Sequence, residues 1–141
     1  MEYFCHKSRG RLFIADPRAK DRGNRKFWLL MRCDPGIVNL YSWLAIRNGW
    51  EILKGSRWGP HVSVVCGERP KGRKLWDSLN GRTCWYNYSV NTRNDNEFVW
   101  LDVQSDDLEQ IREDLGLRRK PYFSFHLTVG RLKFCPNVKV G

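Results

Sequence analysis

The chain has 141 residues, of which 41% are hydrophobic, and this composition predicts one folded domain over residues 1–141 rather than a disordered segment. Its 25 lysine and arginine residues outnumber 15 aspartate and glutamate residues, which gives a formal net charge of +10. This excess predicts a polyanionic partner. Charge alone does not separate a nucleic acid, a nucleotide and a membrane surface.

Cysteine spacing and hydropathy predict the cellular compartment of the protein. No run of eighteen or more apolar residues occurs, and no apolar segment precedes a small-residue cleavage site at the N-terminus. We therefore expect a soluble, unexported protein with no membrane partner. Five cysteines without CxxC spacing are typical of neither a zinc ribbon nor a disulfide framework, and they favour the reducing cytoplasm: Cys5, Cys33, Cys66, Cys84 and Cys135.

The first half of the chain predicts a strand, a helix and a second strand. The apolar run 26–33 has strand length, and Asp34 followed by Pro35 is typical of a helix start. Gly49 predicts the end of that helix, after which the chain passes Gly59 and enters a strand with His61. The expected buried stripe of the helix consists of Ile37, Leu40, Tyr41, Leu44 and Ala45.

The second half repeats this order. Residues 97–103 alternate as a strand, Ser105 is a helix cap, and Gly116 predicts the helix end. The expected buried stripe consists of Leu108, Ile111 and Leu115, and residues 122–131 form the strand with His126. Matching elements of the two halves lie 65 to 71 residues apart, which indicates pseudo-repeats at about 26–66 and 97–131. Two further strands are expected at 11–15 and 82–90.

Two tetrads stand at equivalent places in these halves. They are HVSV at 61–64 and HLTV at 126–129, in a chain with three histidines. Each tetrad places an imidazole two residues before a hydroxyl, and side chains two apart on a strand share a face. One such match is most simply a packed strand, but the doubled context favours a twofold active site. The third histidine, His6, lies outside both tetrads.

The tetrads resemble the signature of the two-histidine (2H) phosphoesterase superfamily, which has two His-x-Thr or His-x-Ser motifs. The segment HVSVVCG at 61–67 is similar to the first motif, with serine in place of the commoner threonine, and HLTVGR at 126–131 is similar to the second. The superfamily includes RNA cyclic phosphodiesterases, RNA ligase-like proteins and phage enzymes that degrade cyclic oligonucleotide signals. The resemblance implies a bilobal, pseudo-twofold α+β fold, with two antiparallel sheets flanking a central cleft and helices on the outside.

Phosphodiester cleavage explains why these residue types recur. One group must deprotonate the attacking oxygen while another protonates the leaving oxygen, and histidine can do either near neutral pH. We therefore predict His61 and His126 as the acid/base pair. Ser63 and Thr128 are predicted to donate hydrogen bonds to the non-bridging oxygens. This chemistry needs no cofactor and no metal.

Four further residues are predicted to bind substrate. Trp58 and Tyr122 precede the tetrad strands, where entering loops line a cleft mouth. Tyr3 is a candidate flap residue. Arg131 follows the second tetrad at the spacing of the family motif, but it lies on the opposite face of a regular strand unless a bulge occurs near Gly130. Asp102 on the preceding strand is not predicted as a site residue.

The predicted function is metal-independent hydrolysis of cyclic di- or trinucleotide signals, and the small size suggests a viral counter-defence enzyme in the host cytoplasm. One alternative is an RNA phosphodiesterase that opens 2′,3′-cyclic ends or cleaves 2′-5′ linkages. An alternative of a different class is an RNA-binding module without turnover, which would use the basic and aromatic surface.

Overall fold

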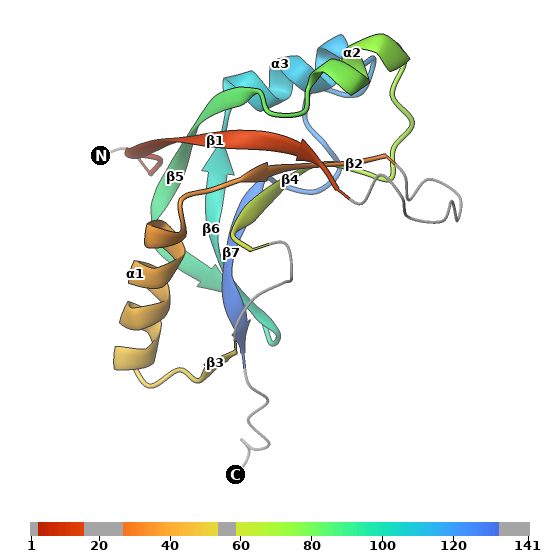
Figure 1. Ribbon diagram of the computed structural model, residues 1–141. Coiled ribbons are helices and arrows are strands. Elements are labelled where there is room, and N and C mark those ends of the chain that lie inside the picture. The colour runs from red at the N-terminus through yellow and green to blue at the C-terminus, as the bar shows by residue number, and fades with distance from the viewer. Residues whose placement is uncertain (1–2, 16–26, 54–58, 133–141) are drawn as a thin grey trace.

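The computed structural model describes residues 3–15, 27–53 and 59–132, apart from the side chain of residue 73 (Figure 1). This part of the chain contains both strands and helices, which confirms the α+β class. Its elements are β1 His6–Ile14, β2 Trp28–Arg32, α1 Pro35–Arg47, β3 Ile52–Leu53, β4 His61–Cys66, α2 Arg73–Ser78, β5 Thr83–Asn94, β6 Phe98–Gln104, α3 Asp106–Asp114 and β7 His126–Leu132.

All strand pairs are antiparallel, and the strands follow the order β3-β7-β4-β2-β1-β5-β6 in one sheet. Strand β7 also pairs with β6, which closes six strands into a barrel with β3 attached at β7. The expectation of two separate sheets is therefore wrong. Because β7 uses one edge for β4 and the other for β6, its hydrogen bonds join the two halves of the chain.

The strand pairing nevertheless repeats along the chain. Strand β1 pairs with β2 and β2 with β4, while β5 pairs with β6 and β6 with β7. One helix follows the second strand of each set, α1 after β2 and α3 after β6. The two sets meet at equivalent strands, β1 with β5 and β4 with β7. The tetrad strands are therefore direct neighbours.

Helix α3 has the local signals that the sequence predicts. The Ser105 hydroxyl accepts a hydrogen bond from the Leu108 amide at 3.1 Å, and Gly116 ends the helix with φ of 76°. Leu108, Ile111 and Leu115 are all buried. The predicted cap, stop and apolar stripe are thus confirmed, and α3 contacts β5 and β4 while its stripe joins the hydrophobic core.

Helix α1 starts and stops as predicted, but its buried stripe is narrower. Asp34 Oδ1 accepts from the Gly36 amide at 2.9 Å, and Gly49 has φ of 93°. Leu40 and Leu44 are exposed, so their predicted burial is wrong. The helix packs only along one edge, because it contacts the sheet chiefly at β7 and the short strand β3. Its buried residues are Ile37 and Ala45, and Val38 and Tyr41 pack partly against the core.

Two elements have no counterpart in the sequence analysis. Helix α2 lies within a basic stretch, and its N-cap is Gly72, which makes no side-chain capping bond, so the usual start signal is missing. Strand β3 has two residues only. Strand β7 begins at His126 rather than at 122.

No described helix is long and apolar enough to span a membrane.

Candidate active site

The register between β4 and β7 brings the two tetrads together. Val62 pairs with Leu127, and both side chains are fully buried. Continued by one residue in each direction, this antiparallel register places His61 opposite Thr128 and Ser63 opposite His126. Opposite residues of neighbouring strands project from the same face. All four predicted catalytic residues therefore share one face of the sheet, which we call the histidine face.

Each tetrad strand has a β-bulge at the same position. The pairing of β2 with β4 shifts by one residue around Val64, and that of β6 with β7 shifts around Val129. Both valines are the fourth residue of their tetrads. A bulge of one residue returns the next side chains to the face that they would otherwise leave. Cys66 and Arg131 consequently lie on the histidine face.

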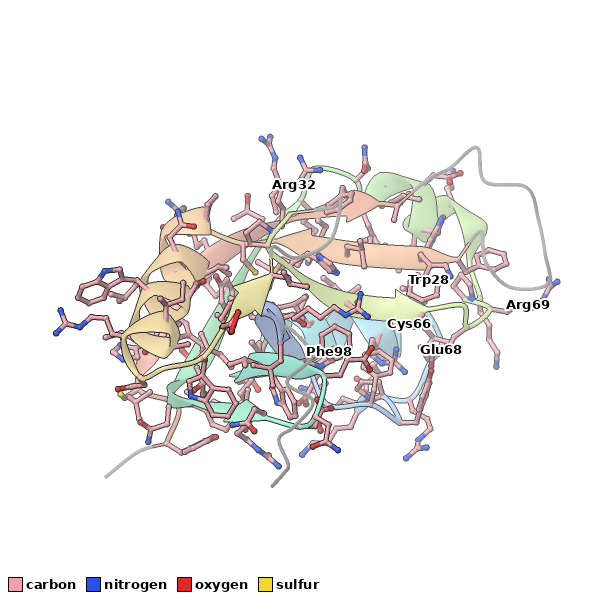
Figure 2. All side chains as sticks on the ribbon, turned by 90° about the horizontal axis from the view of Figure 1, so that it is seen from below. Trp28, Arg32, Cys66, Glu68, Arg69 and Phe98 are labelled. Carbon is pink, nitrogen blue, oxygen red and sulfur yellow. The ribbon has the colours of Figure 1, made fainter. Side chains whose placement is uncertain are left out.

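The residues opposite these two positions are aromatic. Trp28 of β2 pairs with Cys66, and Phe98 of β6 pairs with Arg131. Figure 2 shows Trp28 beside Cys66, with Arg32 toward the other end of β2. Burial raises the pKa of the Cys66 thiol to about 11, although a hydrogen bond with the Ser63 side chain lowers it in part. This thiol is therefore neutral and serves as a partner of Ser63.

Backbone carbonyls orient both imidazoles in the same way. His61 Nδ1 lies 2.8 Å from the Gly59 carbonyl oxygen, and His126 Nδ1 lies 2.8 Å from the Ser124 carbonyl oxygen. Because a carbonyl oxygen only accepts hydrogen bonds, each Nδ1 is assigned the proton that it donates. In each ring Nε2 is the nitrogen that can accept or release a proton during a reaction.

The two histidines are electrostatically coupled. Burial lowers the pKa of His61, the hydrogen bond to Gly59 opposes this shift, and the positive charge of His126 lowers the pKa further. The lowered pKa favours the neutral form of the His61 ring at neutral pH. A neutral imidazole beside a second histidine is the arrangement that a general base and a general acid require.

Strand β6 adds an aromatic ring and a carboxylate to the histidine face. Trp100 pairs with Thr128, and its ring centroid lies 6.3 Å from that of His126. Asp102 pairs with His126, but its carboxylate accepts from Tyr3 Oη at 2.7 Å, Trp100 Nε1 at 3.1 Å and Arg93 Nη1 at 3.3 Å. Asp102 thus tethers its neighbours, whereas the Ser124 carbonyl orients His126.

Two hollows open on the site and meet at Thr128. One, of about 420 Å³, lies beside His126, and the other, of about 380 Å³, lies beside His61. Both volumes are of ligand size. The first is lined by Arg93, Asp95, Phe98, Trp100, Asp102, Ser124, His126 and Thr128. The second is lined by Val38, Asn39, Ser42, Ile52, Leu53, Gly59, Pro60, His61, Thr128 and Val129.

The structure places three of the four predicted substrate-binding residues. Tyr3 reaches the site through its bond to Asp102. Arg131 lies on the histidine face but at its end, where its guanidinium is 3.9 Å from the Glu97 carboxylate. Tyr122 is 77% exposed and packs edge-to-face on Phe123 at 5.0 Å. Trp58 lies outside the described residues. Their roles in binding stay predictions.

Sequence reasoning missed the contributions of β2 and β6. Arg32 pairs with His61, and Trp100 and Asp102 flank His126. Within residues 97–103, Phe98, Trp100 and Asp102 alternate with the three buried apolar residues Val99, Leu101 and Val103. The shared face of Phe98, Trp100 and Asp102 was therefore predictable. Their position beside His126 depends on the register with β7, which alternation does not provide.

No protein-family model, curated protein or solved structure matches this chain. The resemblance to the two-histidine superfamily therefore depends on the residues of the tetrads. Among the described residues, no group of three or more histidine, cysteine, aspartate or glutamate side chains could hold a metal ion.

Proposed function

We propose that this protein is a phosphodiesterase in which His61 and His126 act on opposite sides of one phosphorus atom. One observation supports the proposal above the others: the Val62–Leu127 register, which sets the two tetrads against each other on one face. The matching carbonyl bonds to Nδ1 leave Nε2 of each ring for proton transfer. Two imidazoles on one face can act together, one accepting a proton from the attacking oxygen and the other giving a proton to the leaving oxygen.

The proposed reaction proceeds by proton transfer at the two Nε2 atoms. His61 accepts a proton from water as its oxygen bonds to phosphorus. His126 gives a proton to the leaving oxygen as the bond from that oxygen to phosphorus breaks. Ser63 and Thr128 donate hydrogen bonds to the non-bridging oxygens, where negative charge increases in the transition state. One water is consumed, the products are a phosphomonoester and a hydroxyl, and exchange with solvent restores both histidines.

Two substrate classes are candidates for this chemistry. Cyclic di- or trinucleotides are proposed first, on the resemblance to compact phage enzymes, and they imply a counter-defence role in a host cytoplasm. RNA phosphodiesters are the second candidate. A specific observation favours them, because Arg32 and Arg11 continue from His61 across neighbouring strands, away from both hollows. A phosphate outside the hollows would meet these cations.

The pH dependence of the reaction follows from the lowered pKa of His61. As the general base, His61 must be neutral, so kcat/KM is expected to rise with pH along a limb whose midpoint lies below about 6.5, the ordinary value for histidine. The sign is fixed because burial disfavours the protonated ring. NMR titration of the imidazole nitrogens provides an independent measurement of the same midpoint. A midpoint at 6.5 or above would contradict the assignment of His61 as base.

Turnover of a substrate panel tests the proposed function. The panel contains 3′,3′-cyclic dinucleotides, cyclic trinucleotides, 2′-5′ oligoadenylate and RNA with a 2′,3′-cyclic phosphate end, each with EDTA, and products are resolved by chromatography. We expect EDTA-resistant cleavage of a cyclic oligonucleotide that disappears in the His61→Ala/His126→Ala variant.

The panel separates the alternatives by product. Cleavage of the RNA substrates alone would assign the site to RNA ends. If nothing turns over while RNA still binds the double variant tightly, the protein is a binding module and the proposed function is wrong. Cleavage that persists in the double variant would exclude both histidines from the chemistry.

A further inference from the structure

A band of cationic and aromatic side chains crosses three strands and ends at His61. It consists of Lys7, Arg9, Arg11 and Phe13 of β1, Arg32 of β2 and Trp85 of β5, and we call it the cationic strip. The four β1 residues alternate along the strand and therefore share a face. None of the six lines either hollow of the candidate active site.

Strand register makes the strip continuous. Arg9 pairs with Trp85, Arg11 pairs with Arg32, and Arg32 pairs with His61. Because paired residues project from one face, the strip and the histidine face form one surface. Figure 2 shows Arg32 on the side of the molecule where several nitrogen-tipped side chains extend outward.

The cations of the strip contact aromatic rings. Lys7 Nζ and Arg9 Cζ lie 4.7 Å and 5.2 Å from the centroid of the Trp85 ring, and Arg32 Cζ lies 4.3 Å from that of Phe13. Trp85 remains 49% exposed, and the four cationic residues are exposed.

The described carboxylates do not neutralise the charge of the strip. Within the described ranges, no ion pair joins its four cations to an acidic side chain. Asp107, the carboxylate at its edge, accepts a hydrogen bond from the Trp85 backbone amide at 2.8 Å. A phosphate backbone would supply the missing negative charge.

Exposed aromatic rings beside unpaired cations are the features with which proteins bind single-stranded nucleic acids, because bases stack on the rings and phosphates contact the cations. Trp85 is separated from His61 by three strand spacings, on the order of 15 Å of sheet. At a stacked spacing of about 3.4 Å, four or five nucleotides cover this distance. The strip therefore fits a strand longer than a cyclic di- or trinucleotide.

We propose that the cationic strip binds an unpaired RNA strand, with one base stacked on Trp85 and the backbone directed toward His61. The position of the scissile phosphate at His61 rests on the proposed function, whereas binding to the strip does not. The strip thus defines the polynucleotide side of the site, and the two hollows accept the nucleotides next to the cleaved bond.

Binding of a fluorescent, unpaired RNA of about twelve nucleotides tests the proposal by anisotropy over a series of salt concentrations. We expect Trp85→Leu to weaken binding about 5- to 150-fold. Arg9→Gln/Arg11→Gln is expected to make the slope of log K against log salt less steep by about 1.4, because two phosphate contacts are lost. Melting temperatures confirm that the variants are folded.

Helix α1 offers a matched control. Arg47 lies 4.9 Å from the centroid of the Trp43 ring, which is 53% exposed, so Trp43→Leu/Arg47→Gln removes the same chemistry outside the strip. This control is expected to bind RNA as the wild type does. Equal losses in control and strip variants, or none in either, would overturn the proposal.

The test separates failure of the strip from failure of the proposed function. In the His61→Ala/His126→Ala background, Trp85→Leu is expected to weaken RNA binding by the same factor as in the wild type, whether or not the wild type cleaves RNA. If a cyclic dinucleotide is a substrate, its KM is expected to be the same in the strip variants and in the wild type. A raised KM for that small substrate would overturn the assignment of the strip to longer strands.

Discussion

Replacement of His126 by alanine is expected to lower kcat for phosphodiester cleavage by about 10²- to 10⁴-fold, with little change in KM. His126 is the proposed acid, and without it the leaving oxygen must depart without a proton. Its Nδ1 is fixed on the Ser124 carbonyl at 2.8 Å, which leaves Nε2 to give the proton. Single-turnover kinetics on the best substrate of the panel measures the chemical step directly.

His6 provides the control for this variant. It is the third histidine of the chain, and it stacks on Tyr88 at 5.0 Å rather than lying in a tetrad. His6→Ala is expected to retain the wild-type kcat. A His126→Ala enzyme with a kcat within a few fold of the wild type would remove His126 from the mechanism.

Local signals explain which parts of the fold could be predicted. Asp34, Ser105 and Gly116 act through hydrogen bonds and backbone angles within a few residues, so the sequence contains their full effect. The alternation around Val62 and Leu127 likewise predicts buried strands. The twofold repetition of strands and helices follows from these signals, because each half has its own copy.

Long-range register explains what could not be predicted. Arg32 and Trp100 join the site only through pairing with β4 and β7, and no local pattern encodes a partner strand. The bulge at Val129 is a similar case, because the sequence indicates only that Arg131 needs a bulge near Gly130 to reach the site face. The exposure of Leu40 and Leu44 depends on how much of the helix surface the sheet covers. The helical periodicity of apolar residues does not predict that extent.

The bulge at Val64 has a specific structural support. Arg112 of α3 is fully buried, and its Nη1 donates to the Val64 carbonyl oxygen at 3.0 Å. The same guanidinium binds both carboxylate oxygens of Glu68 at 2.7 Å and the Arg118 carbonyl at 2.7 Å. A bulged residue loses its regular strand partner. Arg112 therefore satisfies the carbonyl at the position that returns Cys66 to the histidine face.

Replacement of Glu68 by alanine is expected to reduce the free energy of unfolding by about 3–5 kcal/mol, because the buried guanidinium of Arg112 would lose its charge partner. Urea denaturation at neutral pH measures the loss. The bidentate bond to Arg112 lowers the pKa of Glu68 below its usual range, although burial opposes this shift. Its contribution to stability is thus present above about pH 4.3 and is lost as pH falls through the lowered pKa.

Two further variants distinguish a buried ion pair from a surface one. Glu113 lies on α3 beside Arg112, and its carboxylate is 3.6 Å from the guanidinium of the exposed Arg119. Glu113→Ala is therefore expected to reduce the free energy of unfolding by about 0–1 kcal/mol. The double variant Glu68→Leu/Arg112→Met is expected to recover stability relative to Glu68→Ala, because no buried charge remains. Equal stabilities of Glu68→Ala and Glu113→Ala would show that Arg112 does not depend on Glu68. The double variant also removes the guanidinium that binds the Val64 carbonyl, so recovered stability together with reduced turnover would separate the fold from the site.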